Sequence, residues 1–230
     1  MLRCVLVVVL PYASCLARPA RSGPGRSGPG RAVGRLRAAS VAGGANVLAQ
    51  YDAALTARPL LTKCASSGLA SACGDALAQS MSPSPFDVGR CVAFALVGAL
   101  YFAPLLHGWY EALAGYERRW RSRGLGRRQS LLLQLAINQT LGALLANCGF
   151  FYALALAEDV CAAEVSTATA ARATRALRDQ LWTVMRANWV VWPLPALVNL
   201  AFVPLRYRVL WTNAVAVVWK CVLSLITKGP

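Results

Sequence analysis

Residues 131–157 read LLLQLAINQTLGALLANCGFFYALALA and contain no acidic or basic side chain. A helix needs roughly 20 apolar residues to cross the hydrocarbon layer of a bilayer. This run exceeds that length, and its apolar residues follow one another too closely for the spacing of an amphipathic surface helix. It therefore predicts a helix that crosses a membrane.

Three further segments of the chain resemble this run. Residues 91–110 and 209–226 are strongly apolar. Residues 188–205 are also apolar but contain prolines, which should bend or interrupt a helix. These prolines are Pro193, Pro195 and Pro204.

A fifth segment, residues 60–80, gives the weakest of the expected spans, because Lys63 and Asp75 fall inside it. It either crosses the membrane or lies flat on its surface. Lys63 and Lys220 can either snorkel toward the headgroups or pair with Asp75. We therefore predict an all-α fold, a polytopic membrane helix bundle of four to five transmembrane helices with a Pro-broken helix near the C-terminus.

Composition supports the membrane interpretation. The chain has 57% hydrophobic and only 14% charged residues, which exceeds the usual proportions of soluble domains. The formal charge of +15 is concentrated in two places, a leader and the segment between the runs at 91–110 and 131–157. The leader contains Arg3, Arg18, Arg21, Arg26, Arg31, Arg35 and Arg37. The second cluster contains Arg118, Arg119, Arg121, Arg123, Arg127 and Arg128. We expect no nucleic-acid binding, because a short loop beside a membrane offers no element that reads bases.

The leader, residues 1–45, repeats RSGPG and is too rich in Gly and Pro to hold a packed structure. An Arg-rich, acid-free leader is typical of a transit peptide for mitochondria or plastids. The apolar stretch from Cys4 to Leu10 also resembles a signal-peptide core, which would suit a plastid reached through the secretory route. We expect residues 1–45 to be disordered or cleaved and residues 46–230 to form a single transmembrane helical domain.

The charges also favour a topology. Five crossings would put the Arg118–Arg128 loop and the turn at Arg206 and Arg208 on the side of the leader. The acidic segment 158–164 would then face the opposite side. Five spans therefore fit the charge pattern better than four.

The sequence contains no recognisable catalytic, cofactor or metal site. His107 is the only histidine, and it is expected to pair with Glu111 one helical turn away. The eight cysteines lack a CxxC pair and are expected to be free and buried. No GxGxxG or GxxxxGK[ST] motif is present. We therefore expect no enzymatic activity and no cofactor.

Polar side chains inside the apolar segments are the candidate functional residues. Lipid cannot satisfy them, so they either join helices or line a solute path. They are Asp75, Gln79, Asn138, Gln139, Asn147, Asn188, Asn199 and Asn213. Asp75 is expected to border a hydrated passage, or else to form a buried pair with Lys63, Arg186 or Lys220.

Residues 188–224 carry a distinctive set of aromatic, proline and polar residues, namely Trp189, Trp192, Pro193, Asn199, Pro204, Arg208, Asn213 and Trp219. This pattern resembles the C-terminal signature of the Mpv17/PMP22 family of organelle membrane proteins. Upstream blocks such as Gly74-Asp75 and Asn138-Gln139 extend the resemblance over about residues 50–227. The resemblance implies a small helical protein of the mitochondrial inner membrane, with peroxisomal or plastid membranes as alternatives, and no enzymatic activity.

The family resemblance also links the chain to small-solute permeability. We therefore expect a channel-like protein that passes small metabolites through amide-lined gaps between helices. The alternative is a non-conducting structural or scaffold protein, whose Arg loop docks a partner or anionic lipid. The expected partners are the lipid bilayer, small solutes if the chain is a channel, and a second copy of the chain in a homo-oligomer.

Overall fold

The computed structural model describes residues 47–82 and 84–227, with side chains described as far as Lys220. The expected leader, residues 1–45, lies outside the described residues. The chain divides into two compact units, with the boundary between Pro59 and Leu60. Residues 47–57 form a helix of the first unit. The account below concerns the second unit, and the expected single domain from residue 46 stays a prediction.

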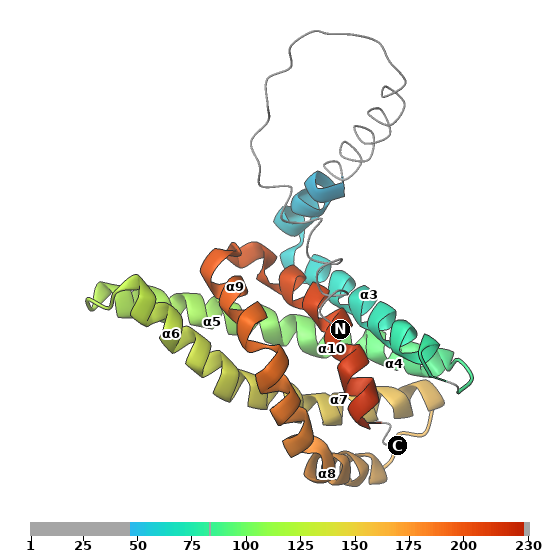
Figure 1. Ribbon diagram of the computed structural model, residues 1–230. Helices are drawn as coiled ribbons and strands as arrows, with labels where there is room; N and C mark the ends of the chain where they lie inside the picture. Colours follow the sequence, from blue (N-terminus) through green and yellow to red (C-terminus); the bar gives the residue numbers. More distant parts are fainter. Residues whose placement is uncertain (1–46, 83, 228–230) are drawn as a thin grey trace, which may run out of the picture. The chain divides into compact units, whose positions relative to one another are not determined.

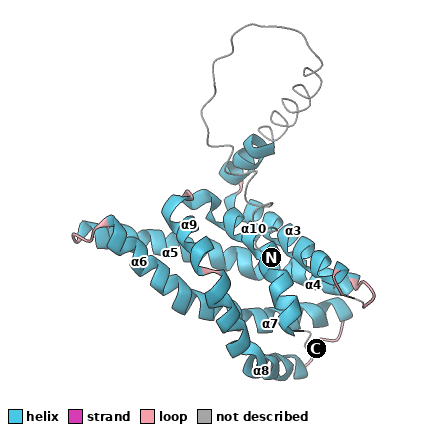
Figure 2. Cartoon of the chain, viewed as in Figure 1, coloured by secondary structure: helices cyan, strands magenta, loops and turns pink. Residues whose placement is uncertain are grey.

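The described residues form helices and no strand, which confirms the predicted all-α fold class (Figures 1 and 2). The elements in chain order are α3 (Pro59–Ser80), α4 (Val88–Leu96), η2 (Val97–Phe102), α5 (Ala103–Ser122), α6 (Arg127–Ile137), η3 (Asn138–Gly142), α7 (Ala143–Ala162), α8 (Ala168–Val191), α9 (Pro193–Phe202), η4 (Leu205–Tyr207) and α10 (Arg208–Thr227). Each segment expected to be an apolar helix is helical over most of its length.

Two continuous helices dominate this unit. The elements α4, η2 and α5 form one helix, Val88–Ser122, and α6, η3 and α7 form another, Arg127–Ala162. Within the described residues, these two are long and apolar enough to cross a membrane. α9 is apolar but shorter. The number of four to five spans therefore stays a prediction.

The Arg-rich cluster is not the loop that we expected. Arg118, Arg119 and Arg121 belong to the end of α5, and Arg127 and Arg128 begin α6. At 1.5 Å per residue, a helix of 35 residues is roughly 50 Å long and exceeds a hydrocarbon layer of about 30 Å. The helices can therefore continue into water, where cations near the C-terminus of α5 also interact favourably with its dipole.

The structure contains the expected proline break. α8 ends at Val191 and α9 begins at Pro193, in the first helical turn, where the missing N–H of proline costs nothing. The buried Arg208 then closes the far end of α9. Its Nε donates to the carbonyl of Val203 at 3.2 Å, and its Nη2 donates to the carbonyl of Leu200 at 3.2 Å. These bonds satisfy carbonyls that the end of a helix leaves without partners.

Aromatic and aliphatic side chains pack between the helices. One cluster joins α4, α7, α8 and α10 around Phe94, Phe150 and Trp219. Many large apolar side chains of the same helices point outward instead, including Leu100 and Val190, which are 71% and 84% exposed. An apolar surface of this kind suits contact with lipid.

Candidate functional site: a cavity with amides in its wall at the middle of the long helices

A cavity of about 110 Å³, partly open at its surface, lies in the second unit. Its wall is formed by α3, η2, α5, η3, α7, α8, α10 and the linker residue Trp192. Water occupies about 30 Å³ per molecule in the liquid, so the space is large enough for a few waters or one small solute. The lining residues are Ser71, Phe102, Leu105, Leu106, Trp109, Tyr110, Asn138, Gln139, Gly142, Ala143, Leu145, Ala146, Asn147, Phe150, Asn188, Trp192, Thr212, Asn213, Ala216, Trp219 and Lys220.

The cavity lies beside the middle of both long helices. Leu105 is central in the helix Val88–Ser122, and Leu145 is close to the centre of Arg127–Ala162. Both helices contain a π-helical segment here, η2 and η3. Such segments are rare and are frequent at functional sites, because they disturb the regular ladder of hydrogen bonds.

Five of the amides expected from the sequence line this cavity. They are Asn138, Gln139, Asn147, Asn188 and Asn213. The sequence identified them because an amide in an apolar helix needs a polar partner. Only the folded chain brings them together, from four different helical segments, η3, α7, α8 and α10.

The π-helical segment η3 is held by two tryptophans. Trp109 donates its Nε1–H to Asn138 Oδ1 at 2.8 Å, and Trp189 donates to the backbone carbonyl of Gln139 at 2.9 Å. Gly142 makes room for the first ring, since a Cβ at this position would lie 2.7 Å from a ring carbon of Trp109. The close packing of Trp109 against η3 therefore requires glycine at position 142.

α7 and α8 meet at a pair of amides. Asn147 Nδ2 donates to the Ala143 carbonyl at 2.8 Å and to Asn188 Oδ1 at 3.3 Å. Among the described residues, the buried Nδ2 of Asn188 has no acceptor, and the buried Oε1 of Gln139 has no donor. The cavity wall therefore presents polar atoms that the described protein atoms leave without partners.

Lys220 is the functional candidate that sequence reasoning missed. We expected it to snorkel or to pair with Asp75, but it is only 5% exposed and lines the cavity. Its Nζ makes no hydrogen bond within the described structure and lies 5.2 Å from the centroid of the Phe94 ring. Gly74 lets its stem pass α3, since a Cβ there would lie 2.9 Å from Lys220 Cδ. The available signal was a lone cation in the middle of the last apolar run.

Asn199, another of the candidate residues from the sequence, makes hydrogen bonds to residues that line the cavity. Its Nδ2 lies 3.0 Å from Tyr110 Oη, 3.1 Å from Thr212 Oγ1 and 3.3 Å from the Arg208 carbonyl. Tyr110 and Thr212 line the cavity, whereas Asn199 itself does not. Asn199 therefore links α9 to α5 and α10.

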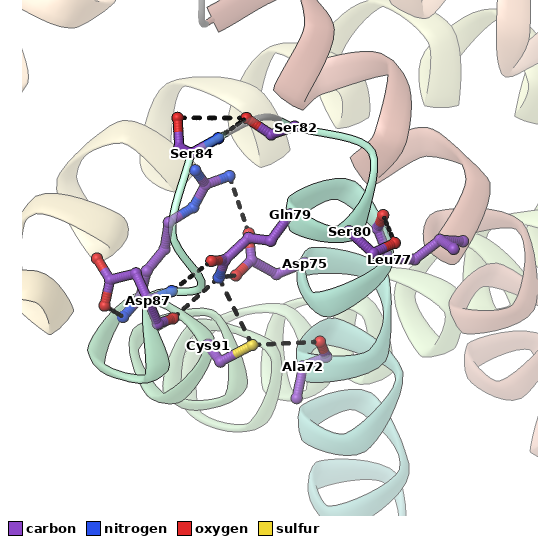
Figure 3. Close-up of polar contacts among 10 residues, drawn as sticks. Ala72, Asp75, Leu77, Gln79, Ser80, Ser82, Ser84, Asp87 and Cys91 are labelled. Carbon is purple, nitrogen blue, oxygen red and sulfur yellow. Dashed lines mark hydrogen bonds and ion pairs between the residues drawn. The ribbon is translucent and has the colours of Figure 1, made fainter.

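Asp75 and Gln79 do not border the cavity, contrary to the first of our expectations for Asp75. Asp75 Oδ1 lies 2.9 Å from Arg90 Nη2, and Gln79 donates to Asp75 Oδ2 at 2.7 Å. Figure 3 shows Gln79 between Asp75 and Asp87, where it accepts from the Asp87 N–H at 2.6 Å and donates to the Asp87 carbonyl at 2.9 Å.

The close ion pair of Asp75 is formed with a residue that we did not expect. We expected Lys63, Arg186 or Lys220, but the chain turns back after α3 and brings Arg90 of α4 beside the carboxylate. Lys63 is instead buried, with Nζ 2.9 Å from His107 Nδ1. His107 of α5 therefore contacts Lys63 of α3, and not Glu111 of its own helix as we expected.

The remaining residues of the C-terminal family signature contribute to packing and to the ends of helices. Trp192 and Trp219 line the cavity and pack edge to face, with ring centroids 6.2 Å apart. Pro204 precedes the short helix η4.

The cysteines described by the structure, at 64, 73, 91, 148 and 161, are free as expected, but Cys73 and Cys161 are exposed. Within residues 47–82 and 84–227, no three His, Cys, Asp or Glu side chains are grouped to hold a metal ion.

Comparison with known proteins extends the similarity to most of the chain. The profile of the Mpv17/PMP22 family matches residues 165–224. The mitochondrial inner membrane protein Mpv17 of Caenorhabditis elegans is 31% identical over 179 residues, which cover 76% of this chain and 90% of the relative. The protein sym-1 of Neurospora crassa is 30% identical over 182 residues, which cover 77% and 97%.

A more distant relative gives the same picture. The protein SYM1 of Saccharomyces cerevisiae is 28% identical over 183 residues, which cover 76% of this chain and 86% of the relative. No solved structure matches the chain. The relatives place the chain in the mitochondrial inner membrane, the first of the locations expected from the sequence. With these relatives matched over nearly their whole length, the chain belongs to the Mpv17/PMP22 family.

Proposed function

We propose that this protein is a channel-like component of the mitochondrial inner membrane that lets small solutes pass between its helices, without enzymatic chemistry. The observation that carries the proposal is the amide-lined cavity of about 110 Å³ beside the middle of the two long helices. A solute that crosses a bilayer needs polar groups at this depth, because the lipid supplies none.

The unpartnered polar atoms support this proposal. A polar group buried in an apolar environment without a partner costs roughly 1–3 kcal/mol, judged by mutational data. Gln139 Oε1, Asn188 Nδ2 and Lys220 Nζ all lack partners within the described residues, and their side chains line the same cavity. Bound water or a solute would satisfy all three.

The alternative is a non-conducting structural protein. The contacts that favour it are those around Asp75 and Asn199, where polar side chains join helices away from the cavity. The two functions differ in one measurable property, because only a channel increases the flux of small solutes across a membrane.

The full-length protein, reconstituted into liposomes, tests the proposal. We expect small uncharged and charged solutes to cross faster than in protein-free liposomes, and Ala146→Phe to reduce this flux by filling the cavity. Ala136→Phe is the matched control, since Ala136 is on the same long helix, is exposed, and does not line the cavity. Folded protein without solute flux would contradict the proposal and favour the structural alternative.

A further inference from the structure

We propose that the cavity is a binding site for a small monocarboxylate, with the carboxylate against Lys220 and Asn188 and a short apolar tail against the aromatic wall. The inference names the class of solute and rests on the proposed function for its role in transport. Binding itself requires no flux, so the two ideas can fail separately.

Lys220 forms no close ion pair in the described part of the chain. All nine Asp and Glu residues of the sequence lie among the described residues, and none of them forms an ion pair with Lys220 within 4.0 Å. Asp75 interacts with Lys220 electrostatically, but its Oδ1 is held by Arg90 at 2.9 Å. A buried cation without a partner is unfavourable, so the site favours an anion from outside the chain.

The donors on the wall match a carboxylate. Lys220 Nζ and Asn188 Nδ2 are both donors without acceptors in the described structure, and their residues are each 5% exposed. An ionised carboxylate is purely an acceptor and has two oxygens to receive them. Water would fill hydrogen-bonding positions but would leave the positive charge uncompensated. The Phe94 ring lies 5.2 Å from Nζ, so one side of the ammonium faces an aromatic ring.

The charge and the shape of the cavity select a monovalent anion. Lys220 is the only cation among the residues that line the cavity. A phosphate dianion would therefore bring a second negative charge into an apolar surrounding without a partner. Leu106, Phe150 and Trp192 give the wall an apolar character that suits a chain of a few methylene groups. A volume of about 110 Å³ accommodates such a chain.

The binding test uses the full-length protein in uncharged detergent and follows its thermal unfolding. Sodium butyrate is titrated against sodium chloride at constant ionic strength, with butyramide as the uncharged analogue of the same shape and sodium phosphate as the competing anion class. We expect a saturable rise of Tm with butyrate, because a ligand that binds only the folded state stabilises it. Butyramide and phosphate should give no saturable rise.

Variants test whether Lys220 carries the binding. Lys220→Met should weaken the apparent affinity for butyrate by at least about tenfold, because a buried ion pair loses one partner. Lys220→Arg keeps the charge and should retain binding. Lys63→Met is the matched control, because it removes another buried lysine, which contacts His107 and does not line the cavity.

A second variant keeps the test decisive if Lys220→Met does not fold. Asn188→Asp changes one atom, leaves Lys220 in place, and adds a carboxylate to the cavity wall, which should compete with butyrate and abolish its effect. Retained butyrate binding in Asn188→Asp, a preference for phosphate, or no response of the wild type to butyrate would each overturn the inference. A butyrate response without flux would instead refute the proposed channel alone, and flux without a response would refute only the monocarboxylate site.

Discussion

Asp75 and Lys220 are both ionisable side chains buried in apolar helices, yet their surroundings differ. Asp75 is 1% exposed, and its two oxygens are engaged by Arg90 and Gln79. Lys220 is 5% exposed, faces a cavity, and has no hydrogen bond or ion pair within the described chain. Burial of a charge therefore does not by itself mark a functional site. A charge whose partner is part of the fold joins helices, and a charge without one is available to a ligand.

The largest expected effect is on the Asp75 side of this comparison. Arg90→Met should lower the free energy of unfolding by about 3 kcal/mol, because it leaves a buried carboxylate without its cation. Chemical denaturation in detergent measures the change. Adding Asp75→Asn to this variant should restore most of the lost stability, since the charge that needed compensation is gone. A double variant as unstable as the single one would show that the ion pair does not join α3 and α4 as proposed.

A smaller difference is expected between two amides, one bonded within the fold and one facing the cavity. Asn199→Leu should cost about 2 kcal/mol, because Tyr110 and Thr212 lose the group that bridges them. Asn188→Leu should cost about 1 kcal/mol or less, because only its Oδ1 has a partner among the described residues. The unfolding free energies of both variants are compared with that of the wild type. Equal losses would remove the distinction between structural and cavity amides.

The smallest expected effect has the opposite sign. Lys220→Met should leave the unfolding free energy unchanged or raise it by about 1 kcal/mol, because it replaces an uncompensated buried cation with an apolar side chain of similar length. The measurement is made without carboxylate in the buffer. Lys63→Met is again the control, and it should lower stability by about 1 kcal/mol, because His107 loses its bonding partner. A marked loss of stability in Lys220→Met would mean that Lys220 has a structural partner.

These comparisons also separate what could be predicted from what could not. The amides at 138, 139, 147, 188 and 213 could be identified as candidates, because each places a polar group in an apolar run. Their assembly around one cavity could not be predicted, because residues from η3, α7, α8 and α10 meet only when each helix has a defined rotation. Asp75 was assigned the wrong partner for the same reason. Arg90 approaches it only because α4 reverses direction after α3.

The helical class, the positions of the apolar helices, the break at Pro193 and the family could all be predicted from the order of the residues. These properties are local, since a run of apolar residues and a missing N–H act within a few residues of chain. Which polar side chains are paired, and which are not, depends on how the helices pack against one another. Close approaches at Gly74 and Gly142 set the position of Lys220 against α3 and of Trp109 against η3. Such contacts depend on the relative rotation and register of helices far apart in sequence. In this packing Lys220 lines a cavity, whereas Asp75 forms an ion pair with Arg90.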